Sequence, residues 1–165
     1  MAFAPGDIMP QKTPPRRVSR GLAFQTLYGQ EFVSSPDSAD LRRAFMAVPR
    51  QTDVQDEGAP TGEADAFAWE LVEGVWQRRA ELDDIIARFA HNWRLERVGR
   101  VELAVLRLAV YEMLYRPDVP AKAALNEALE LERQYGEEKS RIFVNGVLDA
   151  VVKALDKGEL RPVTC

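Results

Sequence analysis

The chain has 165 residues, a formal net charge of −4, one cysteine, Cys165, and one histidine, His91. A single cysteine excludes an intramolecular disulfide and a cysteine-based zinc site. A chain of this length can bury roughly 70% of its unfolded surface, so we expect one domain with its own core. The net negative charge argues against nucleic-acid binding through the whole surface.

Residues 1–15 contain four prolines and few large apolar side chains, which predicts a flexible N-terminal arm. The arm has no apolar core of the kind found in a secretory signal. No apolar run elsewhere approaches the roughly 20 residues that span a bilayer. The sequence therefore predicts no membrane segment and a cytoplasmic location.

The acidic chain has a basic end. Residues 8–30 carry four cations and no carboxylate. Helical spacing begins near Arg16, and arginine gives way to aromatic rings along one stripe: Arg16, Arg20, Phe24, Tyr28 and Phe32. Guanidinium groups pair with phosphates and rings stack on unpaired bases, as in single-stranded RNA binding. Rings at this spacing are more often core, and a basic helix start is often only solvated, so both interpretations stay open.

The middle of the chain predicts further helices. A short helix is expected over 37–47, and an exposed loop over 50–63. Helical spacing returns from residue 64 to about 90 and includes three carboxylates, Glu81, Asp83 and Asp84. Such a group could hold a metal or transfer protons. No histidine accompanies it at ligand spacing, which favours a solvated face.

Residues 92–100 predict a single turn before a central helix that starts at Val101. That helix is apolar on nearly every side, so its charged residues Glu102, Arg107 and Glu112 must reach solvent or find partners.

Two helices are expected between Asp118 and Leu155, with Pro120 at the start of the first and a left-handed Gly136 after its end. The second contains Asn145 and Gly146, although glycine inside a helix costs roughly 1 kcal/mol. Either another segment approaches closely at Gly146 or the position is an ordinary weak point.

No alternating strand, glycine-rich phosphate loop or catalytic motif is found. The sequence therefore predicts an all-α protein of about seven helices without a recognisable catalytic constellation.

Three segments together resemble the NusB family of bacterial transcription antitermination factors: RRVSRGLAFQTLY at 16–28, NWRLERVGRVELAVLRLAVYEMLYRPDVP at 92–120 and LNEALELERQYGEEKSRIFVNGVLD at 125–149. The resemblance runs from Arg16 to about Leu155. It implies a compact domain of two packed helical bundles over 16–158, followed by a tail over 159–165. It also implies no enzymatic activity, no cofactor and no metal.

Proteins of this family bind the single-stranded boxA element of nascent ribosomal RNA transcripts. They act with NusE, a small-subunit ribosomal protein, and join RNA polymerase with other Nus factors to suppress Rho-dependent termination. Some relatives self-associate over the RNA surface, so a homodimer stays open for this chain.

The resemblance assigns roles to individual residues. Arg16, Arg17 and Arg20 match the phosphate-binding start, and Gln25 and Tyr28 follow on the same helix as candidates for base contacts. The remaining assignments are Lys122 and Phe143 toward RNA from the opposing bundle, and Glu102 and Lys139 at the NusE surface.

Two positions depart from the family pattern. Many relatives read DSHKFVNG where this chain reads KSRIFVNG, so Ile142 replaces a lysine and Lys139 replaces an acid. These changes alter the charge of both expected interfaces.

Two other functions compete with this one. The N-terminal domain of some ribosomal RNA cytosine methyltransferases is similar to NusB, which would make the chain part of an enzyme. That interpretation predicts a downstream cofactor domain with a glycine-rich loop, and none follows in this sequence. If the chain were instead a purely structural helical adaptor that never contacts nucleic acid, the basic end of its first helix would serve only to increase solubility.

Overall fold

The computed structural model describes residues 15–34, 36–50, 61–91 and 94–163. The expected N-terminal arm, apart from Pro15, and most of the expected loop over 50–63 lie outside these ranges. The described chain contains seven α-helices, one 3-10 turn and no strand, which confirms the all-α prediction. The elements are α1 Pro15–Gln30, α2 Ser38–Ala47, α3 Thr61–Gln77, α4 Arg79–Phe89, η1 Leu95–Arg97, α5 Arg100–Tyr115, α6 Ala121–Tyr135 and α7 Glu138–Asp156.

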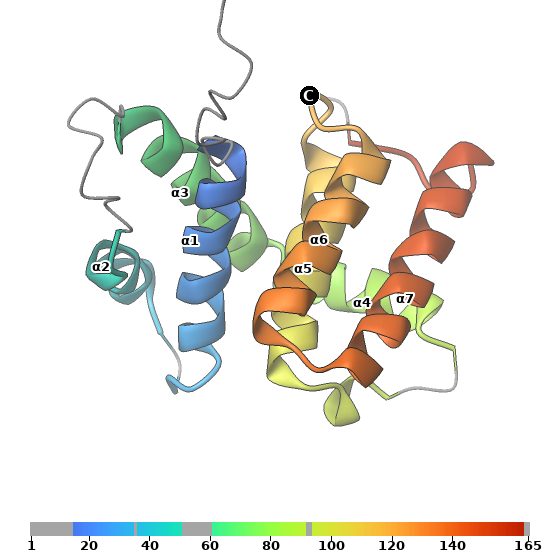
Figure 1. Cartoon of the computed structure of the whole chain (residues 1–165), viewed down its shortest axis with the longest axis horizontal. Coiled ribbons are helices and arrows are strands. Elements are labelled where there is room, and N and C mark those ends of the chain that lie inside the picture. The colour runs from blue at the N-terminus through green and yellow to red at the C-terminus, as the bar shows by residue number, and fades with distance from the viewer. Residues whose placement is uncertain (1–14, 35, 51–60, 92–93, 164–165) are drawn as a thin grey trace, which may run out of the picture.

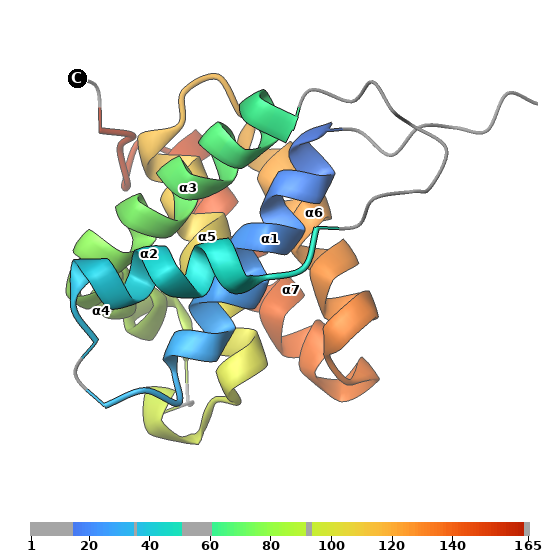
Figure 2. The same ribbon diagram turned by 90° about the vertical axis from the view of Figure 1, so that its left-hand side faces the viewer.

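The helices form two packed bundles (Figure 1). One bundle consists of α1, α2 and α3, with α2 lying across α1 (Figure 2). The other consists of α4, α5, α6 and α7. The central helix α5 packs against α1, α3, α4, α6 and α7, so it belongs to the core of both bundles.

The central position of α5 follows from its sequence. Eleven of its sixteen residues are buried, as expected for a helix that is apolar nearly all round. Two of the buried residues are carboxylates, Glu102 and Glu112. A buried charge without a partner costs several kcal/mol, so the surroundings of these two residues are informative.

Glu112 is paired with Arg20 of α1. The Arg20 Nε atom lies 2.8 Å and 3.0 Å from the two carboxylate oxygens, and Nη2 lies 2.8 Å from Oε2. The two side chains are 8% and 2% exposed. This bidentate pair fixes α1 against α5 and thereby connects the two bundles.

Arg107 supplies a second ionic connection. Its guanidinium donates to Asp83 of α4 at 2.7 Å and 2.8 Å, and to Glu31, just after α1, at 2.5 Å. Asp83 is only partly exposed and is held by Arg107, so the expected solvated acidic face is modified at this residue. Asp84 does lie exposed.

Three local expectations need correction or refinement. The helical spacing over 64–90 is divided at Arg78 into α3 and α4. Gly136 caps α6 in an extended conformation, φ −102° and ψ −175°, instead of a left-handed one. At Gly146 no heavy atom lies within 4 Å of the position that a Cβ would occupy, and Asn145 is exposed. No segment approaches Gly146 within the described chain, so the ordinary weak point is the correct interpretation.

We expect Arg20→Met to lower the free energy of unfolding by roughly 3–5 kcal/mol, because Glu112 would remain buried without its partner. The double variant Arg20→Met with Glu112→Met should recover most of that loss, since it removes both charges. Urea denaturation followed by circular dichroism measures both values. A double variant as unstable as the single one would show that the pair is not what stabilises this contact.

Candidate nucleic-acid interface

Helices α1 and α6 lie side by side and run in the same direction (Figure 1). Three side-chain contacts connect α1 to α6 and the turn before it. Arg16 donates to Asp118 at 2.6 Å, and Arg17 donates to Glu127 at 2.9 Å and 3.1 Å. Further along, Gln25 donates to the hydroxyl of Tyr135 at 3.0 Å. The two helices therefore present one continuous face across both bundles.

One end of this face carries exposed cations. Arg16 and Arg17 are exposed in the first turns of α1, and Lys122 is exposed in the first turn of α6. The hydrogen bond from Arg17 to Glu127 raises the pKa of the guanidinium above its ordinary value. Exposed ion pairs of this kind contribute about 0–1 kcal/mol, so a phosphate can replace the carboxylates at little cost.

The other end of the face carries aromatic rings. Phe24 is buried, Tyr28 is half-buried and Phe32 is exposed, so the stripe predicted on α1 rises gradually to the surface. The Phe24 and Tyr28 rings are stacked with centroids 5.8 Å apart, and Phe32 meets Tyr28 edge-on at 5.2 Å. The core and the surface interpretations of the stripe are each correct for part of it.

Tyr135 joins this aromatic end from α6. Its ring is 4.7 Å from that of Phe24, and 37% of the residue is exposed. Its place here could not be predicted from the sequence, because only the fold brings Tyr135 of α6 beside Gln25 and Phe24 of α1. The only signal in the sequence was an aromatic residue directly before Gly136. The spacing of residues within α6 could not show which side chain of another helix lies beside Tyr135.

Arg20 is not part of this surface. A phosphate contact is predicted for Arg20 from the family resemblance, whereas its guanidinium is buried and bonded to both oxygens of Glu112. A phosphate would have to break that buried pair to reach Arg20, at a cost of several kcal/mol. The four-residue stripe turns gradually around the helix. Arg20 lies one turn after Arg16, where the stripe has already turned toward the core.

A hollow of about 400 Å³ lies beside the first turns of α5 and α7. It brings together Glu102 and Lys139, expected toward a protein partner, and Phe143, expected toward RNA. The hollow lies next to the start of α7, whereas Lys122 lies at the opposite end of α6, so Phe143 and Lys122 are not neighbours. Ile142 at its rim is 75% exposed. The lining residues are Arg97, Val98, Gly99, Glu102, Lys139, Ser140, Ile142 and Phe143.

A carboxylate that no sequence pattern singled out interacts electrostatically with Glu102, although it does not itself line the hollow. Glu132 of α6 is 1% exposed, and within the described ranges neither of its oxygens has a hydrogen-bond partner. Burial, together with the neighbouring charge of Glu102, raises the pKa of Glu132 from 4.5 to about 7, although Arg141 acts in the opposite direction. Glu132 therefore changes its charge near neutral pH.

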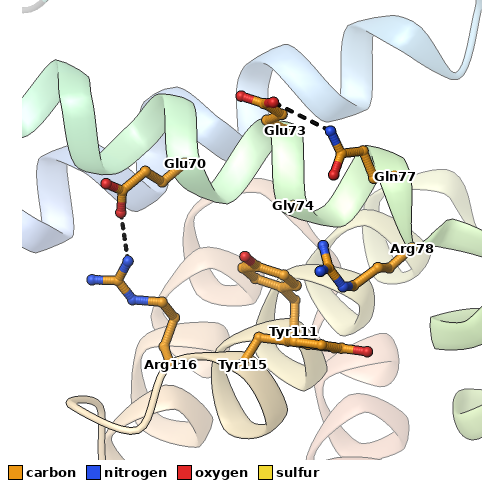
Figure 3. Close-up of a pocket in the computed structure, with 8 residues that line it drawn as sticks. All are labelled: Glu70, Glu73, Gly74, Gln77, Arg78, Tyr111, Tyr115 and Arg116. Carbon is orange, nitrogen blue, oxygen red and sulfur yellow. Dashed lines mark hydrogen bonds and ion pairs between the residues drawn. The ribbon is translucent and has the colours of Figure 1, made fainter. Parts of the chain in front are cut away.

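A second hollow, of about 370 Å³, lies between α3 and α5 (Figure 3). Two acids and two arginines are among its lining residues: Arg116 donates to Glu70 at 2.5 Å, whereas Glu73 accepts from Gln77 at 3.2 Å. The Tyr111 ring lies directly beneath Gly74, where a Cβ would be 2.1 Å from the Tyr111 hydroxyl. None of the predicted site residues lines this hollow.

Across the ranges that the structure describes, no group of three or more histidine, cysteine, aspartate or glutamate side chains could hold a metal ion. In the same ranges no helix is long and apolar enough to span a membrane.

The fold and the arginine and aromatic face define a class of helical protein with a candidate nucleic-acid surface, and comparison with known proteins gives the family. The model of the NusB family matches residues 17–153. The transcription antitermination protein NusB of Oleidesulfovibrio alaskensis is 55% identical over 150 residues, covering 91% of this chain and 93% of that protein. The chain belongs to the NusB family.

Solved structures agree with this assignment. The chain is similar to NusB of T. maritima, with 33% identity, a TM-score of 0.72 and coverage of 91% of this chain and 100% of that one. It is also similar to a chain in the crystal structure of the antitermination factors NusB and NusE in complex with double-stranded RNA. That match has 26% identity and a TM-score of 0.66, and covers 85% of this chain and 97% of that one.

The raised pKa of Glu132 predicts a specific pH dependence of stability. Since its folded-state pKa exceeds the unfolded value, stability falls as pH rises from about 4.5 to about 7. We expect the stability advantage of Glu132→Gln over the wild type to be about 1 kcal/mol larger at pH 8 than at pH 6. Urea denaturation at both pH values measures it, with Glu159→Gln, an exposed acid, as the control. An equal advantage at both pH values would contradict the assignment.

Proposed function

We propose that this protein is a transcription antitermination factor that binds single-stranded boxA-type RNA of nascent ribosomal RNA transcripts together with NusE. In this role it joins RNA polymerase with other Nus factors in the cytoplasm and suppresses premature, Rho-dependent termination. The observation that carries the proposal is the α1 and α6 face, with exposed cations at one end and accessible rings at the other. Membership of the NusB family supports it.

Residues 16–158 act as the RNA-binding domain. Arg16, Arg17 and Lys122 bind phosphates at the basic end of the face. Asp118, the present partner of Arg16, is exposed, and Glu127, the partner of Arg17, is half-buried. Gln25 and Tyr28 contact bases further along, with Tyr135 beside them. Arg20 contributes indirectly, because its pair with Glu112 holds α1 against α5.

The hollow beside α5 and α7 is the protein-partner surface. It presents Glu102 and Lys139 together with the exposed apolar side chain of Ile142. A similar chain of known structure is described as NusB in complex with NusE and RNA, which supports NusE as the partner here. Phe143 lies in the same hollow, so RNA that follows α1 toward its aromatic end would come close to the bound partner.

The methyltransferase-type domain remains the second candidate from the sequence. The antitermination protein of Oleidesulfovibrio alaskensis is matched over 93% of its own length, which favours the antitermination role over a domain of a larger enzyme.

Replacing Arg16 and Arg17 by alanine should weaken boxA RNA binding several-fold at moderate salt. Two lost phosphate contacts should also reduce the slope of log affinity against log salt by about 1.4, at about 0.7 per contact. Filter binding across a salt series, with NusE present, measures both quantities.

The matched control is Arg42→Ala with Arg43→Ala, an adjacent exposed pair on α2 that changes the net charge equally. Equal effects of the two double variants would show that the basic end acts only through its overall charge and makes no specific phosphate contacts. An unchanged affinity and slope in the Arg16 and Arg17 variant would reject this RNA surface.

A further inference from the structure

We propose that Glu132 and Glu102 together form an acceptor site for one basic side chain of the protein partner, which enters through the hollow between the first turns of α5 and α7. The inference rests on the proposed function and adds to it a residue, Glu132, that neither the sequence pattern nor the family resemblance singled out.

Glu132 is poorly stabilised by its own chain. It lies in the last turn of α6, where the helix dipole disfavours negative charge. It is almost fully buried, and within the described residues neither carboxylate oxygen has a hydrogen-bond partner. The like charge that acts on it is Glu102, which is itself only 8% exposed. Helix dipole, burial and a like charge all oppose ionisation.

The ends of two helices make room for this pair of acids. A Cβ on Gly99, the N-cap of α5, would lie 2.0 Å from Oε2 of Glu102. A Cβ on Gly136, the C-cap of α6, would lie 2.2 Å from Oε2 of Glu132. Each carboxylate therefore packs against a glycine, and a larger residue there would require the glutamate side chain to shift. Two acids are held close together at one end of the bundle, and one of them, Glu102, lines the open hollow.

Three cations lie around the pair, but within the described residues none of them forms an ion pair with either acid. Arg141 on α7 favours the charged form of Glu132, but no hydrogen bond or ion pair joins the two side chains. Arg97 and Lys139 lie at the exposed rim of the hollow. Glu102 likewise has no ion pair within the part of the chain that the structure describes. A cation from outside would offset the repulsion between the two acids and supply hydrogen-bond donors to the oxygens of Glu132.

A basic side chain of a protein suits this site better than a free ion. The hollow of about 400 Å³ has apolar side chains at its edge, Ile142 and Phe143, which the stem of a lysine or arginine can cover while its charged end reaches the carboxylates. Within the described residues no third acid completes a metal-ligand group at this position. The occupant is therefore a lysine or arginine of the partner.

The test is isothermal titration of the full chain with purified NusE at pH 7.5, for the wild type, Glu132→Gln and Glu159→Gln. We expect at least a tenfold weaker affinity for Glu132→Gln and an unchanged affinity for Glu159→Gln, an exposed acid far from the hollow. Glu132→Gln should melt no lower than the wild type, and its boxA RNA binding in the absence of NusE should be unaltered.

Proton linkage distinguishes this role from a merely structural one. Because the cation binds the ionised pair, wild-type affinity should rise between pH 6 and pH 8, and binding at pH 6.5 should release a proton. Titrations in buffers of different ionisation enthalpy measure this release. Both effects should disappear in Glu132→Gln.

A Glu102→Lys variant distinguishes a failure of the Glu132 acceptor role from a failure of the proposed partner surface. If Glu132→Gln binds NusE as the wild type does while Glu102→Lys abolishes binding, the acceptor role of Glu132 is overturned and the proposed partner surface stands. If neither variant changes the affinity, the partner surface assigned under the proposed function is wrong as well.

Discussion

The buried pair between Arg20 and Glu112 determines how the two bundles meet. Its bidentate geometry fixes α1 against the central helix α5, and α5 in turn packs against α6. The position of α1 beside α6, and with it the continuous face across both bundles, depends on this contact. A buried ion pair stabilises a fold less than an apolar contact of the same size, but it specifies which side chains must meet. Here it specifies the orientation of the helix that carries the candidate RNA contacts.

Helix α1 therefore has a structural side and a binding side. Phe24 and Arg20 turn inward to the core and to Glu112, whereas Arg17 and Gln25 contact α6 at the surface. The exposed contacts are weak and exchangeable, and the buried ones are strong and fixed. This division lets a phosphate displace surface carboxylates without disturbing the packing of the bundles.

The sequence predicted the helices well because each has a strong apolar period and clear end signals. The apolar α5 had to be central, and Pro120 and Gly136 bracket α6 as expected. Contacts between helices were harder to predict. The arginine stripe could not show that Arg20 turns inward, because that depends on Glu112, 92 positions away. Tyr135 was missed for the same reason.

Apart from the buried Arg20, and from Gln25 and Tyr28 further along α1, the predicted site residues fall into two separate groups. The basic end of the α1 and α6 face holds Arg16, Arg17 and Lys122, while the hollow at the other end of α6 holds Glu102, Lys139 and Phe143. Family resemblance supplied these residues one by one, but only the fold shows which of them are neighbours. The buried acid Glu132 had no signal in the sequence, since a glutamate on an amphipathic helix normally faces water.

The central claim is that single-stranded RNA lies along the face of α1 and α6. Photo-crosslinking of boxA RNA containing 5-bromouridine, in the presence of NusE and followed by peptide mass spectrometry, tests it directly. The account predicts crosslinks at Tyr28 and Tyr135. Crosslinks confined to Tyr111 and Tyr115, in the hollow between α3 and α5, would contradict it.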